Sequence, residues 1–276
     1  MTAERLIDAL QQAENRLTTV RGSSTDAIDT FNAYIKWSND EVSLLGGCVS
    51  PASLDLLLTT PRYWMLQGLD PGTKGSMLAS LVQLEIEQRL RAFEAARTAI
   101  GVEAARYASA DLIVVPDTNV FLHGPARFDL LPWERLATQA APCVLIVVPL
   151  VVVDELDRAK RRTDKVVPEG KEQVRDRART TLRALAELVD DPRRPAVLRS
   201  APTPGGPSVT LLLRLETPGH VRLPDADSEI VDQARVVLDL SGRPTAIVTS
   251  DMGMKLRASA VDLAAVDVPT NEEARS

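Results

Sequence analysis

Four acidic residues of this chain lie where they could carry out chemistry. Asp117 and Asp251 each directly follow a short apolar run that predicts a buried strand. Glu155 lies roughly one and a half turns past Pro149 on a predicted helix, and Asp227 opens another. Each acid therefore stands just beyond a predicted strand or just inside a following helix, and packing explains a carboxylate poorly at such a place.

Carboxylates at these positions point to a metal site. In a parallel sheet the carboxyl ends of the strands meet at one edge, so we expect the four acids to converge there. Their mutual repulsion would raise their pKa values unless a divalent cation lay among them. Ligands that are all oxygen atoms favour Mg²⁺ or Mn²⁺, whereas zinc favours histidine and cysteine. Such a site suits the hydrolysis of phosphodiesters.

The elements that must position these acids alternate between strand and helix from residue 111 onward. Strands are predicted at residues 112–115, 144–148, 245–248 and 263–268, and a β-hairpin at residues 196–199 and 209–215. Helices are predicted after Pro149, over residues 168–188, from Asp227 or Ser228, and from Asp251. This order predicts an α/β fold, a parallel sheet sandwiched by helices.

The first 110 residues show helical periodicity. Residues 6–17 form an amphipathic pattern, Ser24-Thr25-Asp26 can cap a second helix, and residues 51–53 and Pro61 mark further helix starts or turns. A long helix is expected from residue 76 to about 107. We therefore predict two domains, an all-α domain of unknown role at residues 1–110 and an α/β domain at residues 111–270. The helical domain could bind a second copy of the chain or another protein.

Charge is unevenly distributed along the chain. The formal net charge is −6, which argues against a protein that coats nucleic acid. Residues 158–183 nevertheless hold ten Lys and Arg residues against four acids. We expect this segment to guide a polyanion to the acids, with contacts from Arg161, Arg162, Arg175 and Arg179. The alternative is an ordinary solvated helix face.

Location is indicated by what the chain lacks. The polar N-terminus has no apolar signal segment behind it, and no apolar run is long enough to span a membrane. Cys48 and Cys143 lie far apart and match no metal-binding spacing. We therefore expect a cytoplasmic protein that does not contact membranes.

The acidic motifs together resemble those of PIN-domain nucleases. The segments that carry the resemblance are residues 115–121 (VPDTNVF), 148–157 (VPLVVVDELD), 227–230 (DSEI) and 248–251 (VTSD). The resemblance implies a PIN fold, which is Rossmann-like, and cleavage of single-stranded RNA with Mg²⁺ or Mn²⁺. It implies that Asp117, Glu155, Asp227 and Asp251 bind the metal and carry catalysis. Asn119 and Thr249 or Ser250 would support them.

Several alternatives stay open. Asp154 could take the role of Glu155, and Asp225 that of Asp227. A PIN-like module without catalysis could serve as a scaffold for RNA or protein. An aspartyl-phosphate phosphatase also places an aspartate after its first strand, but it needs a second acid two residues later, where this chain has Asn119. His123 and His220 are isolated in sequence, and we assign neither to the site.

Overall fold

The structure is a computed structural model that describes residues 1–70, 75–162, 172–217 and 220–270. The chain divides into two compact units, Met1–Ala104 and Ala105–Ser276. Within these described ranges, no helix combines the length and the apolar character needed to cross a membrane.

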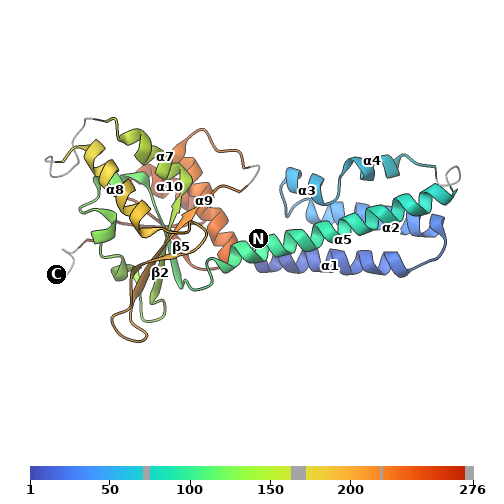
Figure 1. Ribbon diagram of the computed structural model, residues 1–276, viewed down its shortest axis with the longest axis horizontal. Coiled ribbons are helices and arrows are strands. Elements are labelled where there is room, and N and C mark those ends of the chain that lie inside the picture. The colour runs from blue at the N-terminus through green and yellow to red at the C-terminus, as the bar shows by residue number, and fades with distance from the viewer. Residues whose placement is uncertain (71–74, 163–171, 218–219, 271–276) are drawn as a thin grey trace. The chain divides into compact units, whose positions relative to one another are not determined.

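The described part of the N-terminal unit is helical, as predicted (Figure 1). Its helices are α1 (Ala3–Gly22), α2 (Ala27–Leu45), α3 (Pro51–Leu57), α4 (Pro61–Gln67) and α5 (Gly75–Ala105). Asp26 caps α2, and the hydroxyls of Ser50 and Thr60 cap α3 and α4 directly before a proline at the first helical position. The predicted helix starts are confirmed. Apolar side chains from all five helices form one core.

A buried carboxylate, Glu85 of α5, is the main polar feature of that core. Its oxygens lie 3.0 Å from Arg89 Nε and 3.2 Å from Arg62 Nη1, and the Tyr34 hydroxyl donates to it at 3.3 Å. Arg89 Nη1 also donates to the carbonyl of Leu57 at 2.7 Å. Because the charges in this cluster are paired, we read it as a structural link between α5 and α2, α3 and α4.

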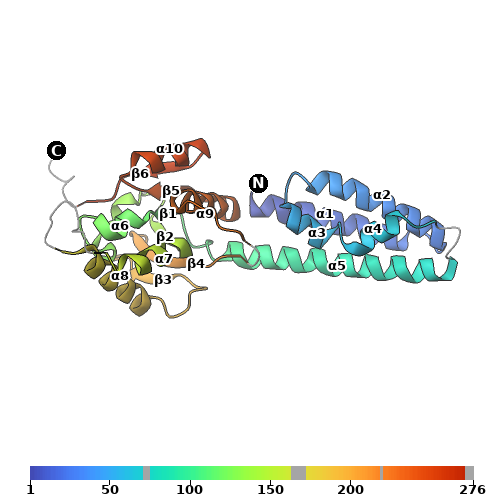
Figure 2. The same cartoon turned by 90° about the horizontal axis from the view of Figure 1, so that it is seen from above.

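The C-terminal unit contains one six-stranded sheet. Its strands are β1 (Leu112–Pro116), β2 (Cys143–Pro149), β3 (Ala196–Arg199), β4 (Ser208–Arg214), β5 (Thr245–Val248) and β6 (Ala264–Val266). They lie in the order β3-β4-β2-β1-β5-β6 (Figure 2). Neighbours are parallel, except that β3 and β4 form the predicted antiparallel hairpin. The predicted α/β sheet is confirmed.

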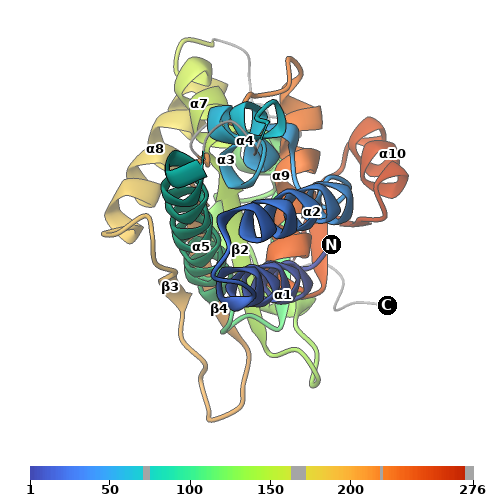
Figure 3. The same ribbon diagram turned by 90° about the vertical axis from the view of Figure 1, so that its right-hand side faces the viewer.

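Helices cover both sides of this sheet. They are α6 (Thr118–His123), α7 (Leu150–Ala159), α8 (Val174–Leu188), α9 (Ala226–Ser241) and α10 (Met252–Ala260). Figure 3 shows the sheet between α7 and α8 on one side and α9 and α10 on the other. The central strands are buried on both faces, since every residue of β5 and all but the first of β1 and β2 are buried. This explains their continuous apolar sequences.

Two helices begin at other residues than predicted. Asp225, rather than Asp227 or Ser228, caps α9, and its carboxylate accepts from the N–H of Ser228 at 3.0 Å. The carboxylate of Asp227 is therefore not used as the cap. The helix predicted from residue 168 is seen from Val174 as α8, and residues 168–171 lie outside the described residues.

Candidate active site

Asp117 is a buried acid at the carboxyl end of β1. Its N–H donates to the carbonyl of Val248 at 3.0 Å, which holds β1 level with the end of β5. One carboxylate oxygen accepts from the N–H of Val120 at 2.9 Å and so caps α6. The other accepts from the hydroxyl of Thr249. The residue is 2% exposed. Burial raises the pKa of Asp117, and the charge of Asp227 adds to the rise, although the hydrogen bonds oppose it.

Glu155 lies on α7, which follows β2. The hydroxyl of Thr118 donates to its carboxylate at 2.5 Å. Its neighbour Asp154 faces another partner, because Arg222 Nη1 lies 2.6 Å from Asp154 Oδ2. Of these two adjacent acids, only Glu155 contributes to the cleft described below.

Asp227 lies in the first turn of α9. Burial raises its pKa, and the charges of Asp225, Asp251 and Glu155 raise it further, while Arg257 lowers it. Arg257 Nη1 lies 3.3 Å from Asp227, and Arg257 Nη2 lies 3.7 Å from Asp225. The charges of three neighbouring acids thus act on Asp227, with one arginine as a partial counter-ion.

Asp251 and Thr249 connect α10 to the buried acid. Asp251 caps α10 by accepting from the N–H groups of Gly253 and Met254. Its own N–H donates to the hydroxyl oxygen of Thr249 at 2.9 Å, and that hydroxyl donates to Asp117. Thr249 is fully buried, whereas the predicted alternative, Ser250, is exposed. The chain of bonds sets the position of Asp251 relative to Asp117.

Three of the four predicted acids line one cleft of about 330 Å³. Asp117, Glu155 and Asp227 contribute from the end of β1, from α7 and from α9, and Asn119 lies beside them. Asp251 does not line this cleft, although its charge acts on Asp227. Among the described residues, no three of these acids bring carboxylate oxygens within 4.8 Å of one another.

Two arginines share the cleft with the acids. Arg158 on α7 and Arg162 just after that helix line it, and sequence reasoning missed Arg158. Its spacing of three residues from Glu155 was the available signal, since residues three and four apart share a helix face. Of the other predicted RNA contacts, Arg161 is exposed at the end of α7. Arg175 and Arg179 lie 3.8 and 3.4 Å from Asp176 on α8.

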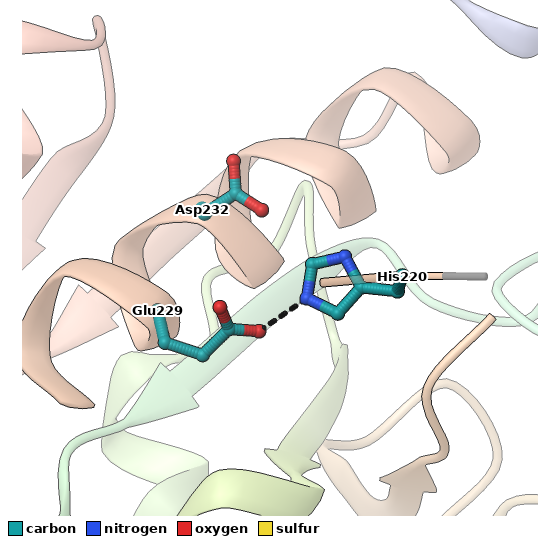
Figure 4. Close-up of side chains that lie close together, drawn as sticks. All are labelled: His220, Glu229 and Asp232. Carbon is teal, nitrogen blue, oxygen red and sulfur yellow. Dashed lines mark hydrogen bonds and ion pairs between the residues drawn. The ribbon is translucent and has the colours of Figure 1, made fainter. Parts of the chain in front are cut away.

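A tighter group of metal-type ligands lies elsewhere on α9. Ligand atoms of His220, Glu229 and Asp232 lie within 4.8 Å of one another (Figure 4). Glu229 already accepts from His220 Nε2 at 2.7 Å, from the N–H of Leu223 at 2.8 Å and from Gln233 Nε2 at 2.8 Å. Burial opposes ionisation of Glu229, but these hydrogen bonds outweigh it and lower its pKa. We read this group as a hydrogen-bonded anchor for residues 220–223.

The donor set of the cleft fits a hard divalent cation. Asp117, Glu155 and Asp227 offer only oxygen ligands. Burial first, and neighbouring negative charge second, raise the pKa values of Asp117 and Asp227, and a bound cation would offset both effects. Among the described residues that line the cleft there is no histidine, cysteine or lysine. The arrangement could bind a cation at its acids and an anion at its arginines.

Comparison with known proteins gives one match. The sequence pattern described as the PIN domain matches residues 114–269, which is more than half of the chain. No curated protein matches the chain. The matched range includes all four predicted acids and the two arginines of the cleft.

Proposed function

The chain belongs to the PIN-domain family, whose members are generally nucleases, and from this premise we propose that it is a metal-dependent endoribonuclease acting on single-stranded RNA. One observation carries the proposal: Asp117, Glu155 and Asp227, from three separate elements, line one cleft with two arginines. A site that binds both a divalent cation and a phosphodiester needs negative carboxylates for the cation and positive groups for the phosphate.

Asp117, Glu155, Asp227 and Asp251 would hold the Mg²⁺ or Mn²⁺. A cation bound there would polarise a phosphodiester and lower the pKa of an attacking water. The chain's own residues hold the acids in place. The hydroxyl of Thr249 and the N–H of Val120 fix both oxygens of Asp117, and the hydroxyl of Thr118 orients Glu155.

Asn119 is exposed at the first turn of α6 and lines the cleft. We propose that its amide orients a water or a phosphate oxygen there. Ser250 is exposed beside Asp251, and we assign the supporting role to Thr249 because it contacts Asp117 directly. Arg161, Arg175 and Arg179 would be outer contacts to the RNA, reached after the cleft is filled.

The test is cleavage of a labelled, unstructured RNA by the purified full-length chain. We expect cleavage with Mg²⁺ or Mn²⁺ and none with EDTA. Glu155→Gln should lose most activity, whereas Asp154→Asn should keep it, because Asp154 pairs with Arg222 outside the cleft. Equal losses in both variants would contradict the assignment of Glu155, and metal-independent cleavage would contradict the mechanism.

A non-catalytic scaffold for RNA or protein is the second candidate. Two observations favour it. No three of the four acids bring carboxylate oxygens within 4.8 Å of one another among the described residues, and Asp227 is paired with Arg257. The scaffold predicts RNA binding without cleavage in any divalent cation. The cleavage experiment therefore separates the two functions.

A further inference from the structure

The side chain of Arg158 lies beside several acids but pairs with none that the structure describes. It lines the same cleft as Asp117, Glu155 and Asp227. Its guanidinium nevertheless makes no ion pair or hydrogen bond with any residue that the structure describes. A guanidinium carries five donors in a rigid planar fork, so all of them remain available to a ligand.

Neighbouring acids on α7 are already engaged. Asp154, four residues before Arg158 and so its natural helical partner, lies 2.6 Å from Arg222. Glu155, three residues before it, accepts from the hydroxyl of Thr118. Asp157 pairs with Lys160. The local sequence therefore supplies Asp154 and Glu155 as partners for Arg158, but Arg222 and Thr118, which are remote in sequence, engage them instead.

Arg162 adds a second positive charge to the same cleft. It lies four residues after Arg158 and just beyond the end of α7. The arginines and the carboxylates thus call for two ligands of opposite charge in one cleft.

We propose that Arg158, with Arg162 beside it, binds a backbone phosphate of single-stranded RNA next to the acids. This inference rests on the proposed function. Two parallel N–H donors of a guanidinium match two oxygens of a phosphate, a geometry that lysine cannot reproduce. Because Arg158 is one helical turn beyond Glu155 on α7, the RNA backbone would enter the acid cleft along this helix.

The competing explanation is that Arg158 is a counter-ion for the acids. In that case its removal would leave more uncompensated negative charge in the cleft. Metal affinity would rise and RNA affinity would stay unchanged. A phosphate-binding Arg158 predicts the opposite: RNA affinity falls and metal affinity changes little.

The experiment measures binding of a labelled oligouridylate to the full-length chain across a series of salt concentrations. The Asp117→Asn background prevents cleavage during the titration. Arg158→Ala should weaken binding about tenfold and reduce the slope of log affinity against log salt by about 0.7, the value for one contact to a single strand. Arg158→Lys should keep most of the slope and lose part of the affinity. Arg193→Ala is the matched control, since Arg193 is an exposed arginine of the same unit that does not line the cleft and has no role in the proposed RNA contacts.

Equal affinities and slopes for Arg158→Ala and Arg193→Ala would overturn the inference, as would tighter Mn²⁺ binding by Arg158→Ala with unchanged RNA affinity. Cleavage by the chain without the Asp117 substitution is measured separately. If the chain cleaves RNA and the two arginine variants have equal salt slopes, the nuclease proposal stands and the role of Arg158 is rejected. RNA binding that depends on Arg158 without any cleavage keeps the inference and removes the hydrolase. If the chain neither binds nor cleaves RNA, both proposals are rejected.

Discussion

Replacing Thr249 by valine tests whether the hydroxyl bridge between Asp117 and Asp251 stabilises the C-terminal unit. Valine has nearly the same shape as threonine, so the substitution leaves no cavity and removes only the hydroxyl. That hydroxyl donates to the buried carboxylate of Asp117 and accepts from the N–H of Asp251 at 2.9 Å. In Thr249→Val the Asp251 N–H loses this acceptor and the carboxylate loses one donor.

The two bonds give the expected magnitude. A hydrogen bond to a charged group contributes about 1.5–3 kcal/mol and one between neutral groups about 0.5–1.5 kcal/mol. Their loss should lower the free energy of unfolding by about 3 kcal/mol. For a unit of the size of Ala105–Ser276, this corresponds to a melting temperature lower by about 6–12 °C. Calorimetry of the metal-free chain in EDTA at neutral pH measures the shift.

Thr181 of α8 provides a matched control. It is also fully buried, but its hydroxyl has no hydrogen-bond partner among the described residues. Thr181→Val should therefore leave stability unchanged or raise it slightly, because it removes an unsatisfied polar group. Thr249→Ser keeps the hydroxyl and loses one methyl group, at a cost of about 1 kcal/mol.

The charge of Asp117 gives the effect a pH dependence. The hydroxyl of Thr249 lowers the pKa of Asp117, so its removal raises that pKa further. The bond is strongest when the carboxylate is ionised, and the difference between Thr249→Val and the unmodified chain should shrink as acid protonates Asp117. A Thr249→Val variant as stable as Thr181→Val, or a deficit independent of pH, would refute this reasoning.

Three further substitutions test the charges around the site. Asp117→Asn should raise the melting temperature of the metal-free chain near pH 7. Because folding raises the pKa of Asp117, the native state loses stability as the pH rises through that pKa, and asparagine avoids this loss. The gain should fade toward pH ~4, and a lower melting temperature at pH 7 contradicts it. Arg257→Ala should bind Mn²⁺ about 1.5- to 5-fold tighter by calorimetric titration, because it frees a half-exposed Asp227 from a screened ion pair; unchanged affinity argues against competition. Glu229→Gln should cost about 2–4 kcal/mol at pH 7, since three donors favour the carboxylate and lower its pKa. That cost should shrink as pH falls below about 4.3, and urea titrations showing equal cost at every pH would count against the assignment.

Local patterns in the sequence predicted most of the elements. The β-branched runs became β1, β2 and β5, because strands buried on both faces need continuous apolar sequence. Caps and prolines located α2, α3 and α4, since the free N–H groups of a first turn are satisfied by the residue just before it. These signals act over a few residues and are readable without tertiary structure.

The sequence also indicated which edge of the sheet holds the acids. A residue after a parallel strand must emerge at the carboxyl edge. Asp117 follows β1 directly, and Asp251 lies three residues beyond the end of β5. Register then places Pro116 opposite Val248, so the residues after the two strands lie near each other. The order of the elements was enough for this conclusion.

Partner choice was decided only by the tertiary structure. Asp154 and Glu155 are adjacent acids on one helix, and nothing in their local sequence shows that Arg222, far along the chain, would pair with the first and leave the second to the cleft. Asp225 likewise took the capping role expected of Asp227 or Ser228 and left the Asp227 carboxylate to face Arg257. For the same reason, Arg158 has no side-chain partner among the residues that the structure describes. Ion pairs depend on distances between segments that are remote in sequence, so residue type and spacing determined which charges are present, and folding determined which of them are neutralised.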